Sequence, residues 1–125
     1  MNLSEYFENA KGVGVLGSAD DDGRVDVAIY GRPHVIDEQT VAFIMADRLT
    51  HQNVQSNPHA AYLFKEEGKG YKGKRLFLTK TKEETDKALI DSVRRRQYDE
   101  SKDKSEYLVY FRVDKVLPLI GPGEE

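Results

Sequence analysis

Three side chains that suit a bound anion, Arg48, Thr50 and His51, occur within one short stretch of this 125-residue chain. They come directly after the apolar run 40–45, where a strand is expected to pass into a short helix. The first backbone N–H groups of a helix have no partner inside it and carry a partial positive charge. A guanidinium, a hydroxyl and an imidazole beside such groups favour a phosphate or another anion. The sequence therefore predicts an anion site at this helix start.

A second candidate for ligand contact is the glycine-rich segment 68–73, which fits the pattern G-x-G-x-x-G. A dinucleotide-binding loop of this pattern needs a strand before it and a helix after it. The residues that follow, 74–79, are strand-like, so a hairpin loop is the simpler interpretation. Because the segment is basic and aromatic, a third interpretation is that it covers an anionic ligand, including one bound by a partner subunit. Its candidate side chains are Lys69, Tyr71, Lys72, Lys74 and Arg75.

The remaining residues with metal-binding or nucleophilic chemistry do not form a familiar motif. The histidines His34, His51 and His59 lack the i, i+4 spacing of a helical metal site. The acidic run 20–22 is followed by Gly23, which favours a hairpin turn over a metal cluster. The chain has no cysteine and no Gly-x-Ser-x-Gly motif, which excludes disulfides, thiol nucleophiles and that class of hydrolase. We therefore predict no metal site.

The charge and hydropathy of the chain limit the kinds of partner that it is expected to bind. The net charge is −3 and the charged residues, 33% of the chain, are mixed in sign, so no global field attracts nucleic acid or a membrane. The basic triplet 94–96 has acidic neighbours and would complement a helix C-terminus. No apolar run reaches the roughly 20 residues that span a bilayer, and residues 1–5 do not resemble a secretory signal. The expectation is a cytoplasmic protein without nucleic-acid or membrane partners.

The elements that must position these side chains are mostly strands. Alternation of apolar and polar residues, with Val25, Val27 and Ile29 facing one way, predicts a strand at 24–31. The run 40–45 is apolar on both faces, as expected of a strand that is covered on both sides. Further strands are predicted at 12–19, 35–36, 59–65, 74–81 and 107–116.

Three short helices are predicted beside these strands. The first is 2–9, and the second carries the anion site and ends at 57–58. The third opens at 81–84, whose sequence Thr-Lys-Glu-Glu matches a capping box, and ends in the triplet 94–96, before a polar loop at 99–105. Most connections between strands are short, so the sheet should be largely antiparallel. The pattern favours a mainly β fold, a small closed or half-closed barrel with peripheral helices.

Two segments of the sequence, together with the order of the predicted elements, resemble a known family. The first is the small-residue strand and hairpin at 12–28. The second runs from 40 to 63 and contains Asn53-Val54, Asn57-Pro58 and Ala61-Tyr62-Leu63 after the basic helix start. In these blocks the chain is similar to the pyridoxamine 5′-phosphate oxidase-like, FMN-binding split-barrel family. The resemblance implies a split β-barrel of about six antiparallel strands with two or three short helices, formed as a single domain by residues 1–125.

The resemblance also implies a cofactor and an assembly. Members of that family form homodimers and bind FMN at the subunit interface, with the phosphate held by basic and hydroxyl side chains at the helix start. The residues at matching positions are Arg48, Thr50 and His51 for the phosphate, and Val27, Ala28, Ile29 and Tyr30 beside the flavin ring. The further candidates, from the other subunit, are Tyr71, Lys74 and Arg75.

The implied function is that of a flavoprotein, an FMN-dependent oxidoreductase with flavin-reductase-like capacity and an unidentified substrate. No side chain needs to be a catalytic acid or base, because hydride chemistry can occur at the flavin alone. Some family members bind haem or a deazaflavin. One alternative is therefore a non-enzymatic module that stores or senses a flavin, haem or nucleotide, with His34 or His59 as haem ligands. Another is a nucleic-acid-binding barrel that uses 69–75 and 94–96.

Overall fold

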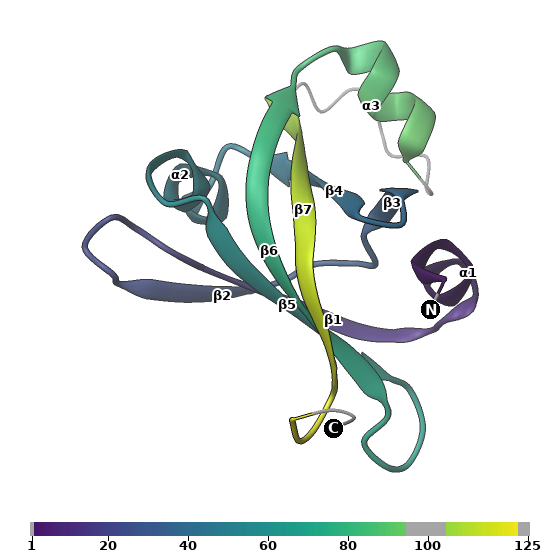
Figure 1. Ribbon diagram of the computed structural model, residues 1–125. Helices are drawn as coiled ribbons and strands as arrows, with labels where there is room; N and C mark the ends of the chain where they lie inside the picture. Colours follow the sequence, from purple (N-terminus) through teal and green to yellow (C-terminus); the bar gives the residue numbers. More distant parts are fainter. Residues whose placement is uncertain (1, 95–104, 123–125) are drawn as a thin grey trace.

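The structure, a computed structural model, describes residues 2–94 and 105–122. These residues form an antiparallel sheet of seven strands in the order β2-β1-β5-β6-β7-β4-β3, accompanied by three short helices (Figure 1). The strands are β1 (Gly12–Ala19), β2 (Val25–Ile29), β3 (His34–Asp37), β4 (Thr40–Ala46), β5 (His59–Glu66), β6 (Gly73–Glu84) and β7 (Glu106–Pro118). The helices are α1 (Leu3–Asn9), α2 (Leu49–Ser56) and α3 (Lys87–Val93). The predicted mainly β architecture is confirmed: the seven strands match the seven segments predicted from the sequence, where the family resemblance implied about six.

The main core lies on one face of the curled sheet, where α1 and α2 also pack. Alternate residues of each strand point into it, because successive side chains of a strand face opposite sides. Its fully buried members include Leu16, Phe43, Tyr62, Leu76 and Phe111, contributed by β1, β4, β5, β6 and β7. The strand prediction at 12–19 and those for the later strands are confirmed within a few residues.

The second cluster lies on the other face of β4 and β7, under α3. Ala42, Leu108 and Tyr110 pack there against Ile90 of the helix, and Ile44 lies beside them. Figure 1 shows α3 at the end of the long β6–β7 pair, close to β4 and β3. The prediction that 40–45 is covered on both sides is therefore confirmed.

The prediction of a helix that opens at Thr81 is wrong. Strand β6 continues to Glu84, because residues 82–84 pair with residues 108–110 of β7. The helix begins later, and its cap is Asp86, whose carboxylate accepts hydrogen bonds from the N–H groups of Ala88 and Leu89. Pairing between two distant strands thus prevails over a local capping pattern, whose residues all lie within one turn.

The basic triplet falls only partly within the described residues. Arg94 forms ion pairs with Glu106 and Asp91, at 2.5 and 3.5 Å. Residues 95 and 96, and most of the predicted loop 99–105, lie outside the described residues. Within residues 2–94 and 105–122, no helix is long and apolar enough to cross a membrane.

Candidate functional site

The N-terminal turn of α2 lies directly after β4, as the sequence predicted. Arg48 is the N-cap residue, in an extended conformation and without a side-chain cap hydrogen bond. The N–H of Gln52 donates to the carbonyl of Arg48 at 3.0 Å, which closes the first turn. The preceding N–H groups of a helix have no acceptor within it. This turn therefore presents backbone donors beside the side chains of Arg48 and Thr50.

Tyr30, Arg48 and Thr50 lie together at this turn. Burial raises the pKa of the Tyr30 phenol, and a hydrogen bond with Thr50 and the positive charge of Arg48 partly offset that rise. Thr50 is only 4% exposed, whereas the Arg48 side chain is exposed and has no hydrogen bond or ion pair within the described residues. The structure thus places a free guanidinium next to two hydroxyl groups and a helix start.

His51 faces a different side of α2, toward β6 and β7. It is 6% exposed, and its ring stacks on Tyr107 with 3.8 Å between the centroids. Its Nε2 lies 3.1 and 3.2 Å from the two carboxylate oxygens of Glu83, and its Nδ1 lies 4.0 Å from Oδ1 of Asp47. The observed partners of His51 are therefore carboxylates, and direct contact with an anion stays a prediction.

Glu83 reaches His51 because β6 contains a bulge. The register of β6 against β7 shifts between Lys80 and Lys82, so Thr81 is an extra residue. One extra residue in a strand changes which face the following side chains occupy. Glu83 therefore shares a face with Lys80, whose Nζ lies 2.8 Å from its Oε1. In a regular strand, residues three apart would face opposite sides.

Three donors surround the Glu83 carboxylate. Partial burial raises its pKa, but hydrogen bonds from Lys80, Gln55 and His51, with the charge of His51, outweigh that effect and lower the pKa to about 2. Gln55 lies one helical turn after His51 and donates from Nε2 to Oε1 at 2.9 Å. The carboxylate therefore joins one face of α2 to β6.

This network predicts a loss of stability in acid. Because the pKa of Glu83 is lower in the folded state, its contribution is fully present above about pH 4.5 and is lost as the pH falls toward about 2. We expect Glu83→Gln to lower the free energy of unfolding by about 1 kcal/mol at neutral pH, since solvent screens a partly exposed group. Urea unfolding of both proteins between about pH 3 and 7 should show this difference shrinking in acid. Glu84→Gln, one residue along, is the control, and an equal pH dependence for both variants would contradict the assignment.

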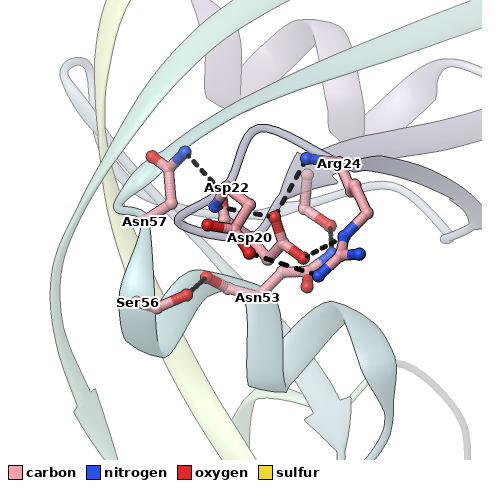
Figure 2. A network of polar contacts seen from close by, with 7 residues as sticks. Asp20, Asp22, Arg24, Asn53, Ser56 and Asn57 are labelled. Carbon is pink, nitrogen blue, oxygen red and sulfur yellow. Dashed lines mark hydrogen bonds and ion pairs between the residues drawn. The ribbon is translucent and has the colours of Figure 1, made fainter.

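The C-terminal half of α2 is anchored to the β1–β2 hairpin (Figure 2). Asn53 donates to the Ser18 hydroxyl at 3.0 Å, and Asn57 donates to the Asp20 carbonyl at 3.3 Å. The Asp20 carboxylate accepts from the backbone N–H of Arg24 at 2.9 Å and forms an ion pair with its side chain. The predicted hairpin turn at 20–23 is confirmed, with Gly23 at a φ of 86°. The two asparagines of the resemblance block therefore fix the helix to the sheet.

The residues predicted beside a flavin ring divide between two faces of β2. Val27 and Ile29 lie on the outer face and are 70% and 73% exposed. Ala28, like Tyr30, is half-buried on the opposite face, which is turned toward α2. Tyr30, which directly follows this edge strand, forms a hydrogen bond with Thr50, one of the predicted phosphate residues.

The candidates Tyr71, Lys74 and Arg75 lie far from α2 within one chain. Tyr71 is exposed in the loop of the β5–β6 hairpin, which confirms the hairpin interpretation of segment 68–73. Lys74 lies 4.4 Å above the ring of Tyr6, and Arg75 donates to the carbonyl oxygens of Pro118 and Gly121. Residues 74 and 75 pair with the end of β5 that is remote from α2 (Figure 1).

The sequence interpretation did not find the carboxylate of Glu83. Residues 81–84 were assigned to a helix start, which would have carried Glu83 away from the sheet. A signal did exist, because His51 and Gln55 are four residues apart and so share one face of a helix. Two donors on one face indicate a buried acceptor opposite, but not which residue supplies it.

Comparison with known proteins identifies the fold. No protein-family model matches the chain, and no curated protein matches it significantly. Among solved structures, an FMN-binding protein from Syntrophomonas wolfei aligns over 97% of this chain and 86% of its own, with a TM-score of 0.79 and 14% identity. A pyridoxamine 5′-phosphate oxidase-like protein from Lactobacillus delbrueckii aligns over 92% and 89%, with a TM-score of 0.67 and 16% identity.

A third similar structure is HutZ, a haem storage protein from Vibrio cholerae. It aligns over 94% of this chain and 95% of its own, with a TM-score of 0.67 and 15% identity. The identities are low while the alignments span nearly all of each chain, so the similarity is one of fold. The fold expected from the two sequence blocks is therefore confirmed: the chain has the pyridoxamine 5′-phosphate oxidase-like split-barrel fold.

Proposed function

We propose that this chain binds FMN and holds the phosphate at the N-terminal turn of α2. The observation that carries the proposal is the exposed Arg48 guanidinium, which has no partner within the described residues and lies beside Thr50. A guanidinium forms strong charge-assisted hydrogen bonds with phosphate oxygens, and helix N–H groups add to them. The similarity of the fold to an FMN-binding protein supports the same ligand.

We also propose that the chain acts as a homodimer, because the outer face of its sheet is apolar. Val25, Val27 and Ile29 of β2 are 70–81% exposed. Strand register places Val27 beside Gly17, then Ala61, then Phe77, across four strands. Leu63 of β5, two residues after Ala61 and therefore on the same face, is also exposed. Monomers rarely expose an apolar patch that extends over several strands.

A second copy of this chain is the occupant that suits this face. Gly17 and Ala61 carry little or no side chain, so two sheets can approach closely there, while Val27 and Phe77 provide apolar area on either side. In the dimer that we propose, segment 71–75 of one subunit lies near the α2 turn of the other, whereas within one chain residues 74 and 75 pair with the end of β5 that is remote from α2. Tyr71, Lys74 and Arg75 therefore remain candidate ligand residues from the partner subunit.

The proposed activity is that of an FMN-dependent oxidoreductase with an unidentified substrate. Bound FMN supplies hydride and electron transfer, and the protein supplies binding and orientation. In this proposal Arg48 and Thr50 hold the phosphate, with His51 in the same turn. The strand residues Val27, Ala28, Ile29 and Tyr30 lie beside the ring. No side chain has to act as an acid or base.

Arg48→Ala should weaken FMN binding. The variant loses a charge-assisted hydrogen bond, which contributes about 1–3 kcal/mol, or roughly a 5- to 150-fold rise in Kd. Titration of the protein with FMN, followed by flavin fluorescence, measures this change. Lys87→Ala is the matched control, because it removes an exposed cation of α3 and leaves α2 unchanged. An unchanged Kd for Arg48→Ala would place the phosphate elsewhere, and a protein that neither carries flavin as purified nor binds it would contradict the proposed function.

A second candidate is a binding module that stores haem. The specific observation is the exposed imidazole of His59 at the start of β5, on a sheet whose fold is similar to that of a haem storage protein. Imidazole is a usual axial ligand of haem iron. Haem titration of the wild type and of His59→Ala, with NADH and NADPH turnover measured alongside, distinguishes this candidate from a flavin enzyme.

A further inference from the structure

The first turn of α2 is held to the rest of the fold by two sets of contacts, those of His51 and the hydrogen bond between Thr50 and Tyr30. The far end of the helix is anchored by Asn53 and Asn57, whereas the side chain of Arg48, at its start, has no hydrogen bond or ion pair within the described residues. His51 belongs to the same turn as Thr50, and its ring is bound to Glu83 and stacked on Tyr107. The orientation of the turn therefore depends on what holds His51 as well as on the Thr50–Tyr30 hydrogen bond.

Two carboxylates and an aromatic ring surround the side chain of His51. Asp47 faces the ring from the β4–α2 connection, Glu83 from β6 and Tyr107 from β7, and Lys80 forms an ion pair with Glu83. A carboxylate can only accept hydrogen bonds, so Nε2 of His51 is the donor to Glu83. Both carboxylates lie near a helix start that carries Arg48. Their charge alone would weaken the binding of an anion there.

We propose that Glu83 is a positioning residue for the anion site of α2. It holds His51, and through the shared turn it places Arg48 and Thr50 where a phosphate meets them. This inference rests on the proposed function, and it gives His51 an indirect role in place of direct contact with the ligand. It also explains why a carboxylate is retained beside an anion site, since its hydrogen bonds to α2 outweigh its unfavourable charge.

The two effects of Glu83 on anion binding have opposite signs, which makes the inference testable. If the carboxylate acted only through its charge, Glu83→Ala would bind FMN more tightly than the wild type. If it positions the turn, Glu83→Ala should raise the Kd for FMN about tenfold, the scale of one lost hydrogen bond. Riboflavin, which lacks the phosphate, should bind both proteins equally. Glu83→Gln keeps an acceptor for His51 and should restore most of the affinity.

A measurement without ligand separates this inference from the proposed function. In the free protein, the N–H of Gln52 bonds to Arg48 O, and that of Asn57 bonds to Asn53 O. In Glu83→Ala, amide hydrogen exchange at Gln52 should become about tenfold faster, while Asn57 stays protected by its own anchors. Exchange that rises equally at both ends indicates general destabilisation and overturns the inference.

The remaining outcomes are equally decisive. Tighter FMN binding by Glu83→Ala, or an equal loss of FMN and riboflavin affinity, overturns the positioning role. Glu84→Ala, which changes the next residue of β6, is the control and should match the wild type in both measurements. If the wild type binds no FMN, the proposed function fails, and exchange at Gln52 alone then decides whether Glu83 positions the turn.

Discussion

A chain that carries Val27→Lys should be monomeric at concentrations where the wild type forms the dimer that we propose. Val27 is 70% exposed at the centre of the apolar outer face of β2. A two-fold symmetric interface contains each substitution twice, so two lysines would enter the same interface. Like charges brought together in an interface cost several kcal/mol, which corresponds to a rise of at least about 100-fold in the dimer Kd. Light scattering over a range of concentrations measures the change.

The control for this substitution lies on the other edge of the sheet. Ile36 of β3 is 45% exposed, and Ile36→Lys should leave the dimer unchanged. Because the ligand is proposed to lie at the interface, Val27→Lys should also lose FMN. A wild type that stays monomeric, or two variants that behave alike, would rule out this face as the dimer interface.

Gly14→Ala should lower the free energy of unfolding by about 1–3 kcal/mol, the usual cost of overpacking. A Cβ at Gly14 would overlap the hydroxyl of Tyr62 and the carbonyl of Tyr30. That hydroxyl donates to the carbonyl of Gly31 at 2.9 Å and belongs to a residue that is only 1% exposed, so it has no room to move away. Urea unfolding followed by circular dichroism gives the change.

Gly17→Ala is the matched control on the same strand. A Cβ there would meet its nearest atom, the carbonyl oxygen of Ala61, at 3.6 Å, which is an ordinary contact. Because Gly17 lies in the proposed dimer interface, both glycine variants are compared in the Val27→Lys background, where the stability of Gly17→Ala should stay near that of its parent. Equal losses in the two variants would show that any added side chain on β1 is unfavourable, and would contradict a specific role for the Tyr62 hydroxyl.

Much of the fold could be predicted because its strands carry local signals. The alternation of Val25, Val27 and Ile29 identified β2, and an apolar run with no polar face identified β4 as buried on both sides. The end of β6 could not be predicted, because Thr81 to Glu84 matches a helix cap and only pairing with β7 decides otherwise. Local patterns therefore located the elements, and contacts between distant strands fixed their lengths.

The sequence likewise predicted the position of some site residues but not the orientation of others. Arg48 and Thr50 follow a buried strand, and that position is enough to place them at a helix start. The sequence could not show that His51 points away from them, because its orientation depends on a carboxylate that is 32 positions away. The alternation did predict that Val27 and Tyr30 lie on opposite faces of β2, but it could not show which of the two faces turns toward α2.

The bulge at Thr81 determines which charged side chain of β6 faces α2. Beyond the bulge, Lys82 lies over the ring of Tyr110 on the α3 side, while Glu83 faces His51. If the same β6 sequence paired with β7 without the bulge, Thr81 would lie opposite Tyr110, and Lys82 and Glu83 would exchange faces, because side chains alternate along a strand. An ammonium group would then lie opposite the imidazole, and the carboxylate would lie under α3. The polarity of this contact is thus set by the bulge, since a regular register of the same β6 sequence would reverse its sign without changing any of the side chains involved.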